Sequence, residues 1–580
     1  MHPLRERLYL VRRRARHTVG VFGLLALAVV LAGCGPGTAV TAPPSTLSIA
    51  LGPQSSLDWW PPIVPGNDCY TLTGGGVTGP DMYLPLLWIN RKDGIEFDRS
   101  IASGIRVSDD YTRFTVTINP KWRWSNGRPV TAQDVVYDWT LIHGASGSTS
   151  PLPYCYAGVG GVPQDWAAVR ATGPHTLVVQ TRTSVNPVWF EHNGLGQLVP
   201  IPKSVWDRYA NVNQELAWIK SIANDPGNAV YRVVDGPYRI VQAVPDQYWR
   251  FAANPRYSGT APHIKSILYD YESSDAAEFA QLKKGAVDIA TIPFSYFASA
   301  HQLKGYRLIR EDAFAFDFIH LNFHADTPGV GPLFNRLYIR QALQMGIDQS
   351  AIITSLYHGL ATPTRGPVPF RPANLYYDAK LPNMYPYNPT RGRNLLESHG
   401  WRLVDGVMTR GSQRLAFTYI YPSASTTLQH IAELLKASWA QEGIQARLEP
   451  LGGTLYLDTI GVAANSDKWA VAGRGVWIYF PDYYPSGGAL FTTDAGVNFG
   501  GYRSARMNQL IAATYQGGTA TAITQRFNAY QTYAAQQLPV LYVPTPGALY
   551  AVRDDVHNFA ASYNAIVGYA PDNRLTFSQP

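Results

Sequence analysis

The chain has 580 residues, which is too long for one small core and predicts at least two lobes. Its formal net charge is +7, but residues 1–33 hold six Arg and Glu6, a net +5, so the remainder carries 7 − 5 = +2. The basic balance therefore gives no argument for nucleic acid or acidic lipid as a partner.

The first 33 residues have the features of an export signal and are excluded from the fold. Six arginines precede the apolar run Val19–Ala32, which is too short to span a membrane comfortably. The run ends Leu31-Ala32-Gly33-Cys34, which resembles the lipobox of bacterial lipoproteins. This resemblance implies cleavage before Cys34, a lipid anchor on its thiol and a location at the outer face of the cell membrane. The alternative is a plain signal peptide followed by a chance Cys.

Residues 34–45 are rich in Gly, Pro, Thr and Ala without an apolar period, and we interpret them as a flexible tether. Beyond the tether only two cysteines remain, Cys69 and Cys155. An exported location permits a disulfide, so we predict that they pair. The alternative is two buried free thiols.

The first expected strand is Thr46–Leu51, whose residues alternate between apolar and polar. Further on, residues 74–79 formally satisfy the G-x-G-x-x-G pattern of dinucleotide sites. Such a site needs a strand before the pattern, a helix after it and an acidic residue beyond, which the following Pro80-Asp81 and its neighbours do not supply. We therefore expect a loop here and no cofactor.

Residues 109–139 predict a strand, a tight turn and a capped helix. The strand is indicated by alternation, and the turn by Asn126-Gly127, because both residues tolerate a positive φ. Thr131 is placed to cap the helix, with Asp134 as the reciprocal partner. The apolar positions of the strand are Phe114, Val116 and Ile118.

The stretch Trp124–Tyr137 resembles the signature of the family 5 extracellular solute-binding proteins, the oligopeptide, dipeptide and nickel receptors of ABC importers. It contains Asn126-Gly127 and then Pro129-Val-Thr-Ala-Gln-Asp-Val-Val-Tyr137. Later stretches resemble the family in the same order: Gly236-Pro237-Tyr238, Leu321-Asn322-Phe323, Ile339-Arg340-Gln341-Ala342 and Gly400-Trp401. The resemblance implies an α/β, two-lobe fold like that of type II periplasmic binding proteins, with an extra subdomain inserted in the first lobe.

On this basis we expect the first lobe over residues 46–310, with the inserted subdomain at about 83–195. The second lobe is expected over 311–543, and 544–580 is expected to return to the first lobe. Short helices are expected as well, including one near residue 205 that Ser204 would cap.

Other site chemistries have weaker support. His320 and His324 lie on one face of an expected strand, but no third ligand with convincing spacing is visible, so we predict no metal site. The sequence contains no G-x-S-x-G, H-E-x-x-H or C-x-x-C motif, so we predict that the protein is not an enzyme.

The segment Trp477–Pro485 occupies the place of a family segment that contacts ligand. In peptide-binding members an Asp stands three residues after the Trp and pairs with the ammonium of the peptide; here that position is Phe480, and Asp482 is the fifth. Either a rearranged loop lets Asp482 pair with the ammonium, or the ligand lacks one. The candidate ligand contacts are Trp477, Tyr479, Asp482 and Tyr483, and the alternative for each is a structural role.

The resemblance implies a monomeric lipoprotein that captures short peptides between its lobes and delivers them to a membrane permease. Ligand that contacts both lobes only when they close would stabilise the closed form. The alternatives are a receptor of the same fold for an oligosaccharide, a metal chelate or haem, and a surface lipoprotein that no longer serves transport.

Overall fold

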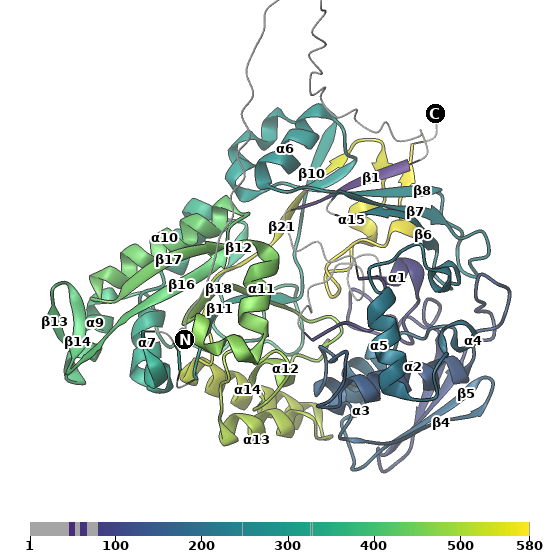
Figure 1. The fold of residues 1–580 in the computed structure, drawn as a ribbon, viewed down its shortest axis with the longest axis horizontal. Helices are drawn as coiled ribbons and strands as arrows, with labels where there is room; N and C mark the ends of the chain where they lie inside the picture. The colour runs from purple at the N-terminus through teal and green to yellow at the C-terminus, as the bar shows by residue number, and fades with distance from the viewer. Residues whose placement is uncertain are drawn as a thin grey trace, which may run out of the picture. The chain divides into compact units, whose positions relative to one another are not determined.

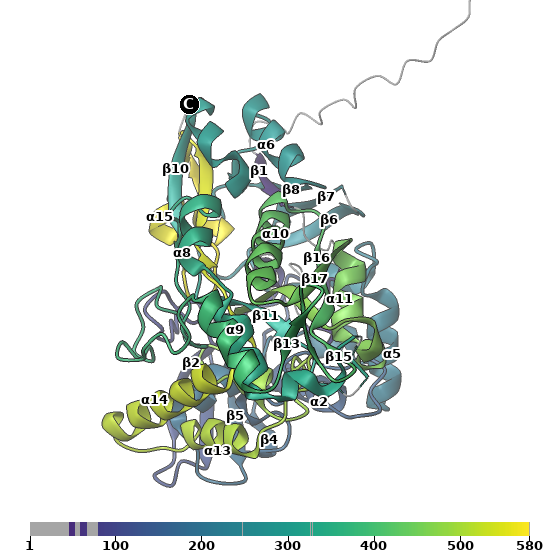
Figure 2. The same cartoon turned by 90° about the vertical axis from the view of Figure 1, so that its left-hand side faces the viewer.

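The structure is a computed structural model that describes residues 46–52, 59–66, 79–245, 247–324, 326–327 and 329–578. Figure 1 shows its helices and strands from one side and Figure 2 after a quarter turn. None of the helices in these ranges combines the length and the apolar character needed to cross a membrane. The export signal, the tether and Cys69 lie outside the described residues.

A mixed seven-stranded sheet joins the two ends of the described chain. The strand order is β10-β21-β9-β1-β8-β7-β6, in which β1 runs parallel to β8 and β9 and the other pairs are antiparallel. The strands are β1 (Thr46–Leu51), β6 (Tyr238–Val244), β7 (Tyr248–Ala253), β8 (Ser266–Tyr271), β9 (Ile289–Thr291), β10 (Tyr306–Glu311) and β21 (Ala548–Arg553). The late strand β21, yellow in Figure 1, therefore lies inside a sheet that the earliest strand helps to build.

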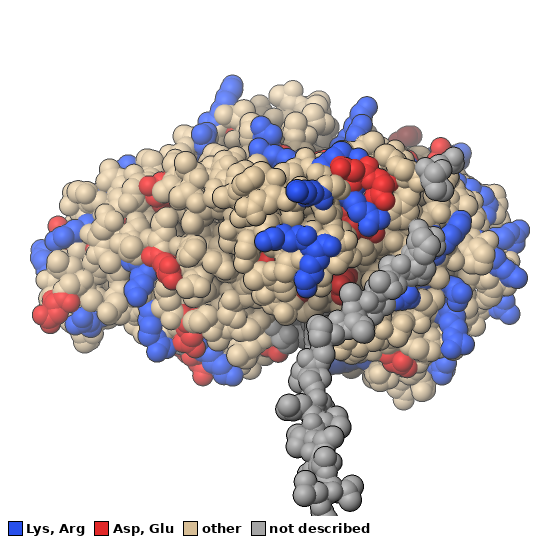
Figure 3. Space-filling model, turned by 90° about the horizontal axis from the view of Figure 1, so that it is seen from above, with Lys and Arg blue, Asp and Glu red and all other residues tan. Residues whose placement is uncertain are grey.

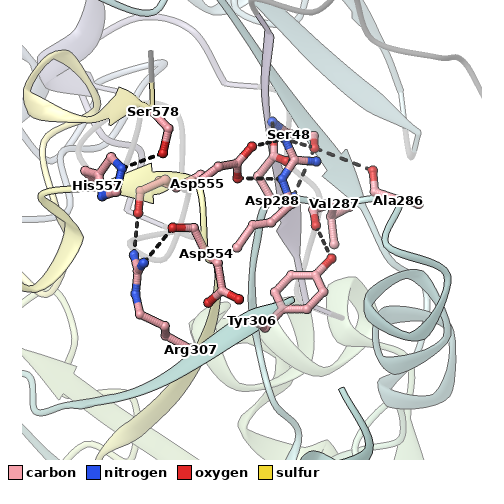
Figure 4. Close-up of polar contacts among 12 residues, drawn as sticks. Ser48, Ala286, Val287, Asp288, Tyr306, Arg307, Asp554, Asp555, His557 and Ser578 are labelled. Carbon is pink, nitrogen blue, oxygen red and sulfur yellow. Dashed lines mark hydrogen bonds and ion pairs between the residues drawn. The ribbon is translucent and has the colours of Figure 1, made fainter. Parts of the chain in front are cut away.

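A polar cluster holds these chain ends together (Figure 4). Asp288 accepts hydrogen bonds from the backbone N and the Oγ of Ser48, at 2.7 and 3.0 Å. Its other oxygen lies 2.6 Å from the Arg553 guanidinium, which also pairs with Asp555. The cluster thus links β1, β9 and β21 through a carboxylate that is only 2% exposed.

The family signature follows β3 (Arg113–Ile118) of an antiparallel four-stranded sheet and continues into α2 (Ala132–Ala145). The order of this sheet is β2-β3-β5-β4, with β2 (Ala102–Val107), β4 (Trp166–Gly173) and β5 (Thr176–Thr181). The predicted turn is confirmed, with Gly127 at φ 89°. The predicted cap is confirmed too, because the Asp134 carboxylate accepts the Thr131 N–H at 2.8 Å at the start of α2.

The third main sheet has five strands in the order β17-β16-β18-β11-β19. They are β11 (Ala315–Leu321), β16 (Ala416–Pro422), β17 (Gln445–Leu451), β18 (Val471–Ile478) and β19 (Leu541–Tyr542). β11 is buried along its whole length, including Asp317 and His320. We call the part of the molecule built on the seven- and four-stranded sheets lobe I, and the part built on the five-stranded sheet lobe II.

Helices surround the sheets. Those before residue 312 are α1 (Gly79–Met82), α3 (Pro187–Trp189), α4 (Lys203–Trp206), α5 (Val212–Ile222) and α6 (Asp275–Lys284). The later ones are α7 (Leu337–Met345), α8 (Gln349–Ala351), α9 (Pro389–Ser398), α10 (Thr426–Gln441), α11 (Gly453–Gly461), α12 (Gly488–Phe491), α13 (Ala505–Thr514), α14 (Ala520–Gln537) and α15 (Phe559–Ser562). The predicted cap at Ser204 is wrong: α4 already begins at Lys203, and its N-cap is Pro202, whose ring fixes its own φ, here at −67°.

Shorter elements complete the description. The small strands are β12 (Ala361–Thr362), β13 (Arg402–Val404), β14 (Val407–Arg410), β15 (Gln413–Arg414), β20 (Thr545–Pro546), β22 (Val556–His557) and β23 (Thr576–Phe577). The 3₁₀ and π turns are η1 (Val159–Gly161), η2 (Phe190–Gly194), η3 (Leu195–Gln197), η4 (Ala229–Arg232), η5 (Phe294–Gln302), η6 (Gly331–Asn335), η7 (Ile352–Leu356), η8 (Ala463–Lys468) and η9 (Asp572–Arg574). On the face in Figure 3, positive and negative side chains are interspersed among uncharged ones.

Candidate functional site

The end of β18 and the segment that follows it carry all four predicted contact residues. Trp477 is still in register with Phe316 of β11, and the Tyr479 N–H then donates to the Phe314 carbonyl at 2.8 Å. The Tyr479 hydroxyl donates to the Pro367 carbonyl at 2.7 Å. Trp477 and Tyr479 are therefore fixed by lobe II itself, and both are buried.

Asp482 is buried among neutral hydrogen-bond donors. Its Oδ1 accepts from the Asn193 amide at 2.6 Å, and its Oδ2 accepts from the Trp477 indole at 3.3 Å. Burial raises the pKa of Asp482 well above its usual value, and the hydrogen bond from Trp477 only partly opposes this. No basic side chain contributes to the shift, so the carboxyl group has no charged partner among the described residues.

Asn193 joins the two lobes at this point. It lies at the end of η2, after the four-stranded sheet of lobe I, and is fully buried. Its amide N–H group also donates to the Tyr484 carbonyl at 2.8 Å, while its oxygen accepts the Tyr484 N–H at 2.7 Å. One side chain of lobe I thus holds the backbone and a carboxyl group of lobe II, and we call residues 186–197 and 477–484 the seam.

Further contacts extend the seam. The Asn186 amide donates to the Tyr484 hydroxyl at 2.8 Å, and Trp189 stacks on Tyr515 with ring centroids 4.2 Å apart. At another point the Tyr376 hydroxyl of lobe II donates to Asp93 of lobe I at 3.2 Å. These groups are amides, hydroxyls and rings, with Asp93 the one acidic group among them.

A pocket opens beside the seam between residues of both lobes. Lobe I contributes most of its wall, and lobe II contributes Phe480, Pro481 and Tyr483. Of the predicted contacts, Tyr483 lines this pocket, whereas Trp477, Tyr479 and Asp482 are not among its lining residues. The aromatic rings that line it are Tyr83, Trp88, Tyr154, Tyr156, Phe480, Tyr483 and Tyr569.

The remaining predicted site residues are cysteines and histidines. Cys155 is disulfide-bonded, but Cys69 and Cys34 lie outside the described residues, so pairing of Cys69 with Cys155 stays a prediction. His320 is 5% exposed, and burial lowers its pKa to about 3. Within the described ranges no three His, Cys, Asp or Glu residues gather closely enough to hold a metal ion.

Sequence reasoning did not single out Asn193, Tyr484 or the pocket tyrosines of lobe I. Asn193 and Asp482 are 289 positions apart, and no periodicity relates two such distant residues. One feature of the sequence could have indicated the pocket tyrosines Tyr154 and Tyr156: they flank Cys155. Because Cys155 is disulfide-bonded, the backbone around it is held in place, and so are the two neighbouring tyrosines.

Known proteins share this architecture. A Brucella ovis relative, named for peptide binding in ABC transport, is 24% identical over 353 residues, which are 59% of this chain and 58% of that protein. The Bacillus subtilis oligopeptide-binding protein AppA, solved with a nonapeptide, superposes with a TM-score of 0.78 at 16% identity, covering 92% of this chain and 99% of AppA. Campylobacter jejuni NikZ, solved with Ni(L-His), gives a TM-score of 0.72 at 16% identity, covering 89% and 96%.

These likenesses confirm the α/β, two-lobe type II fold expected from the sequence. The sequence model of the bacterial extracellular solute-binding proteins, family 5, middle region, matches residues 96–497. That match covers more than half of the chain, and it includes the signature stretch, the seam and half of the residues that line the pocket. The chain therefore belongs to the family 5 bacterial extracellular solute-binding proteins.

Proposed function

We propose that this chain is the substrate-binding lipoprotein of an ABC importer and that it captures short peptides between its lobes and delivers them to a membrane permease. The observation that carries the proposal is the pocket whose wall is completed by lobe II residues, in a chain of a solute-binding family. Relatives named or solved as peptide receptors support the choice of ligand. Binding, without catalysis, is the proposed activity.

The mechanism follows from the seam. When the lobes part, the amide and hydroxyl groups of the seam and the walls of the pocket become accessible to water and ligand. When they close, Asn193 and Asp482 come together again and the ligand is enclosed. A ligand shifts this equilibrium by the difference between its affinities for the two states, and the permease would recognise the closed one.

The structure bears on the alternative ligands through Asp482. Asn193 and Trp477 occupy both of its carboxyl oxygens, and Asp482 does not line the pocket. We therefore propose Asp482 as a residue that holds the lobes together, with Tyr483 as the ligand contact. A ligand without a free ammonium, such as the metal chelate in the similar NikZ structure, is the second candidate.

Mass spectrometry of ligand released from the purified protein would separate these candidates. Peptides in the released fraction, and heat on titration with mixed short peptides, are the expected results. A chelate or sugar in their place would favour the second candidate, and absence of any solute would favour a lipoprotein without a transport role.

The lipid anchor is proposed from Leu31-Ala32-Gly33-Cys34 alone. Metabolic labelling with an acyl-chain probe should label the full-length chain, and Cys34→Ser should abolish the label and release the protein from the membrane fraction. A mature protein that is released with Cys34 intact would contradict the anchor. It would leave the ligand proposal untouched, because the pocket is made elsewhere.

A further inference from the structure

The wall of the pocket beside the seam has no charged side chain among the described residues. It combines aromatic rings with Pro, Val, Ile, Gly and one Gln. A charged group that enters a dry pocket without a partner costs several kcal/mol or more, whereas an apolar group gains on leaving water. The pocket therefore discriminates between ligand groups by charge.

Several polar groups of the wall are hydrogen-bonded within the protein. The Tyr154 hydroxyl donates to the Gln197 amide oxygen at 3.1 Å, and the Tyr156 hydroxyl donates to the Phe480 carbonyl at 3.4 Å. The Gln197 amide N–H group donates to the carbonyl oxygens of Val159, at 2.8 Å, and Asn193. These contacts engage the Tyr154 and Tyr156 hydroxyls and the Gln197 amide, and the rest of the wall consists mainly of aromatic rings and apolar side chains.

Two acidic groups close to Tyr483 are also engaged elsewhere. Asp482 accepts from Asn193 and Trp477, as described above. Asp93 accepts from Tyr376 and lies 3.6 Å from the His192 imidazole. Neither carboxyl group lines the pocket, so a lysine or arginine side chain would find no counter-ion there.

We propose that this pocket receives one uncharged, apolar side chain of the bound peptide and so makes the receptor selective for peptides that carry such a residue. The inference rests on the proposed function. The cavity is about 50 Å³, against about 150 Å³ for a cavity that accepts benzene. The guest is thus a single side chain, and a large one requires Tyr483 and Phe480 of lobe II to stand further from lobe I.

The test is selection from a random library of three- to nine-residue peptides by the leaderless protein, with the retained peptides sequenced by mass spectrometry. We expect Leu, Ile, Val, Phe or Met to be enriched at least tenfold over Asp, Glu, Lys and Arg at one position. Retention without a preference at any position, or with charged residues preferred, overturns the inference and leaves peptide binding intact. Retention of no peptide overturns the proposed function and the inference with it.

A charge placed in the wall provides an independent check. Val567 lines the pocket and is 8% exposed, so Val567→Glu introduces a carboxylate without a counter-ion. Retained peptides should then change from apolar to Lys or Arg at the selected position. The matched control is Val241→Glu, the same change at a position that is 47% exposed on β6, which should keep the apolar preference.

Circular dichroism and thermal melting establish that each variant folds before selection. If Val567→Glu folds and still retains the same apolar peptides as the control, the pocket is not the site of selection and the inference is overturned. If it does not fold, the library result on the unaltered chain decides alone, because that result requires no substitution.

Discussion

Two buried carboxyl groups join distant parts of this chain, and they do so by different chemistry. Asp288 joins the chain ends within lobe I and is paired with the Arg553 guanidinium at 2.6 Å. Asp482 joins lobe II to lobe I and has neutral donors, the Asn193 amide and the Trp477 indole. Burial raises the pKa of both, but Arg553 opposes the rise only at Asp288.

The difference matches what each joint has to do. Opening the Asp288 joint would break the sheet that holds β1, β9 and β21 together, so a strong, charge-assisted contact suits it. The seam has to open for ligand and close again. Because its groups are largely neutral, its two sides can separate without leaving an unpaired buried charge on either lobe.

The largest expected effect comes from breaking the charged joint. Asp288→Ala removes the acceptor of two Ser48 hydrogen bonds and the partner of Arg553, so the free energy of unfolding of lobe I should fall by about 2–3 kcal/mol. Urea unfolding measures this. Asp555→Ala is the control: Asp555 pairs with the same Arg553 but is 45% exposed, so its loss should cost less than about 1 kcal/mol. Equal losses would mean that burial does not distinguish the two contacts.

The next effect comes from breaking the neutral joint. Asn193→Ala removes the hydrogen bonds to Asp482 and Tyr484 that exist only when the lobes are together. We expect the radius of gyration in X-ray scattering to increase and peptide affinity to fall about tenfold, or about 1.4 kcal/mol, at little cost to the lobes themselves. Asn213→Ala on the exposed start of α5 serves as the control. A variant that unfolds as readily as Asp288→Ala would show that the seam is a permanent part of the core.

A smaller effect concerns pH. In the joined state burial holds the pKa of Asp482 well above 3.8, and on separation water returns the pKa towards that value. The joined state therefore binds the proton more tightly, so its stability is greatest below the ordinary pKa and is lost as pH rises through the raised one.

Asp482→Asn should reduce this dependence of the radius of gyration on pH in the range above the ordinary Asp pKa of 3.8. Asp93, whose pKa is raised by burial as well, keeps part of the dependence in the variant. An unchanged pH profile would show that Asp482 remains accessible to water in the joined state, and the contrast with Asp288 would then lose its basis.

The smallest effect is expected at the edge of the seam. Tyr376→Phe removes only the hydroxyl that donates to Asp93 at 3.2 Å and keeps the ring packed against Tyr484. Peptide affinity should fall by less than threefold, equivalent to about 0.6 kcal/mol, in isothermal titration. A loss of affinity as large as that expected for Asn193→Ala would mean that the Tyr376–Asp93 contact contributes as much to joining the lobes as the contacts of Asn193 do.

Local patterns predicted the parts of the fold that local chemistry decides. The alternation of Phe114, Val116 and Ile118 and the reciprocal contacts of Thr131 and Asp134 involve residues within a few positions of each other, and both are confirmed. The Ser204 cap failed at the same scale, because several residues near a proline can serve as the first of a helix. The family resemblance predicted the lobes, because it compares the order of many such local patterns.

The site was less accessible to prediction. With 36 Tyr in the chain, composition cannot tell that Tyr83, Tyr154 and Tyr156 line one pocket, since only the packing of distant segments decides it. The position of Asp482 in the sequence pointed to an altered ligand segment. The role of Asp482, however, depends on its contact with Asn193, and nothing in the spacing of the sequence relates these two residues. The export signal, the tether and the partner of Cys155 remain predictions from the sequence.

The place of β21 between β10 and β9 has a consequence for the order in which the fold can be completed. Synthesis proceeds from the amino end, so when β10 has been made the strand that must separate it from β9 is still more than two hundred residues away. Until β21 is made, β9 and β10 each lack a neighbour with which they pair in the finished sheet. The sheet that contains the first strand of the described chain is therefore completed only after every strand of the five-stranded sheet has been synthesised.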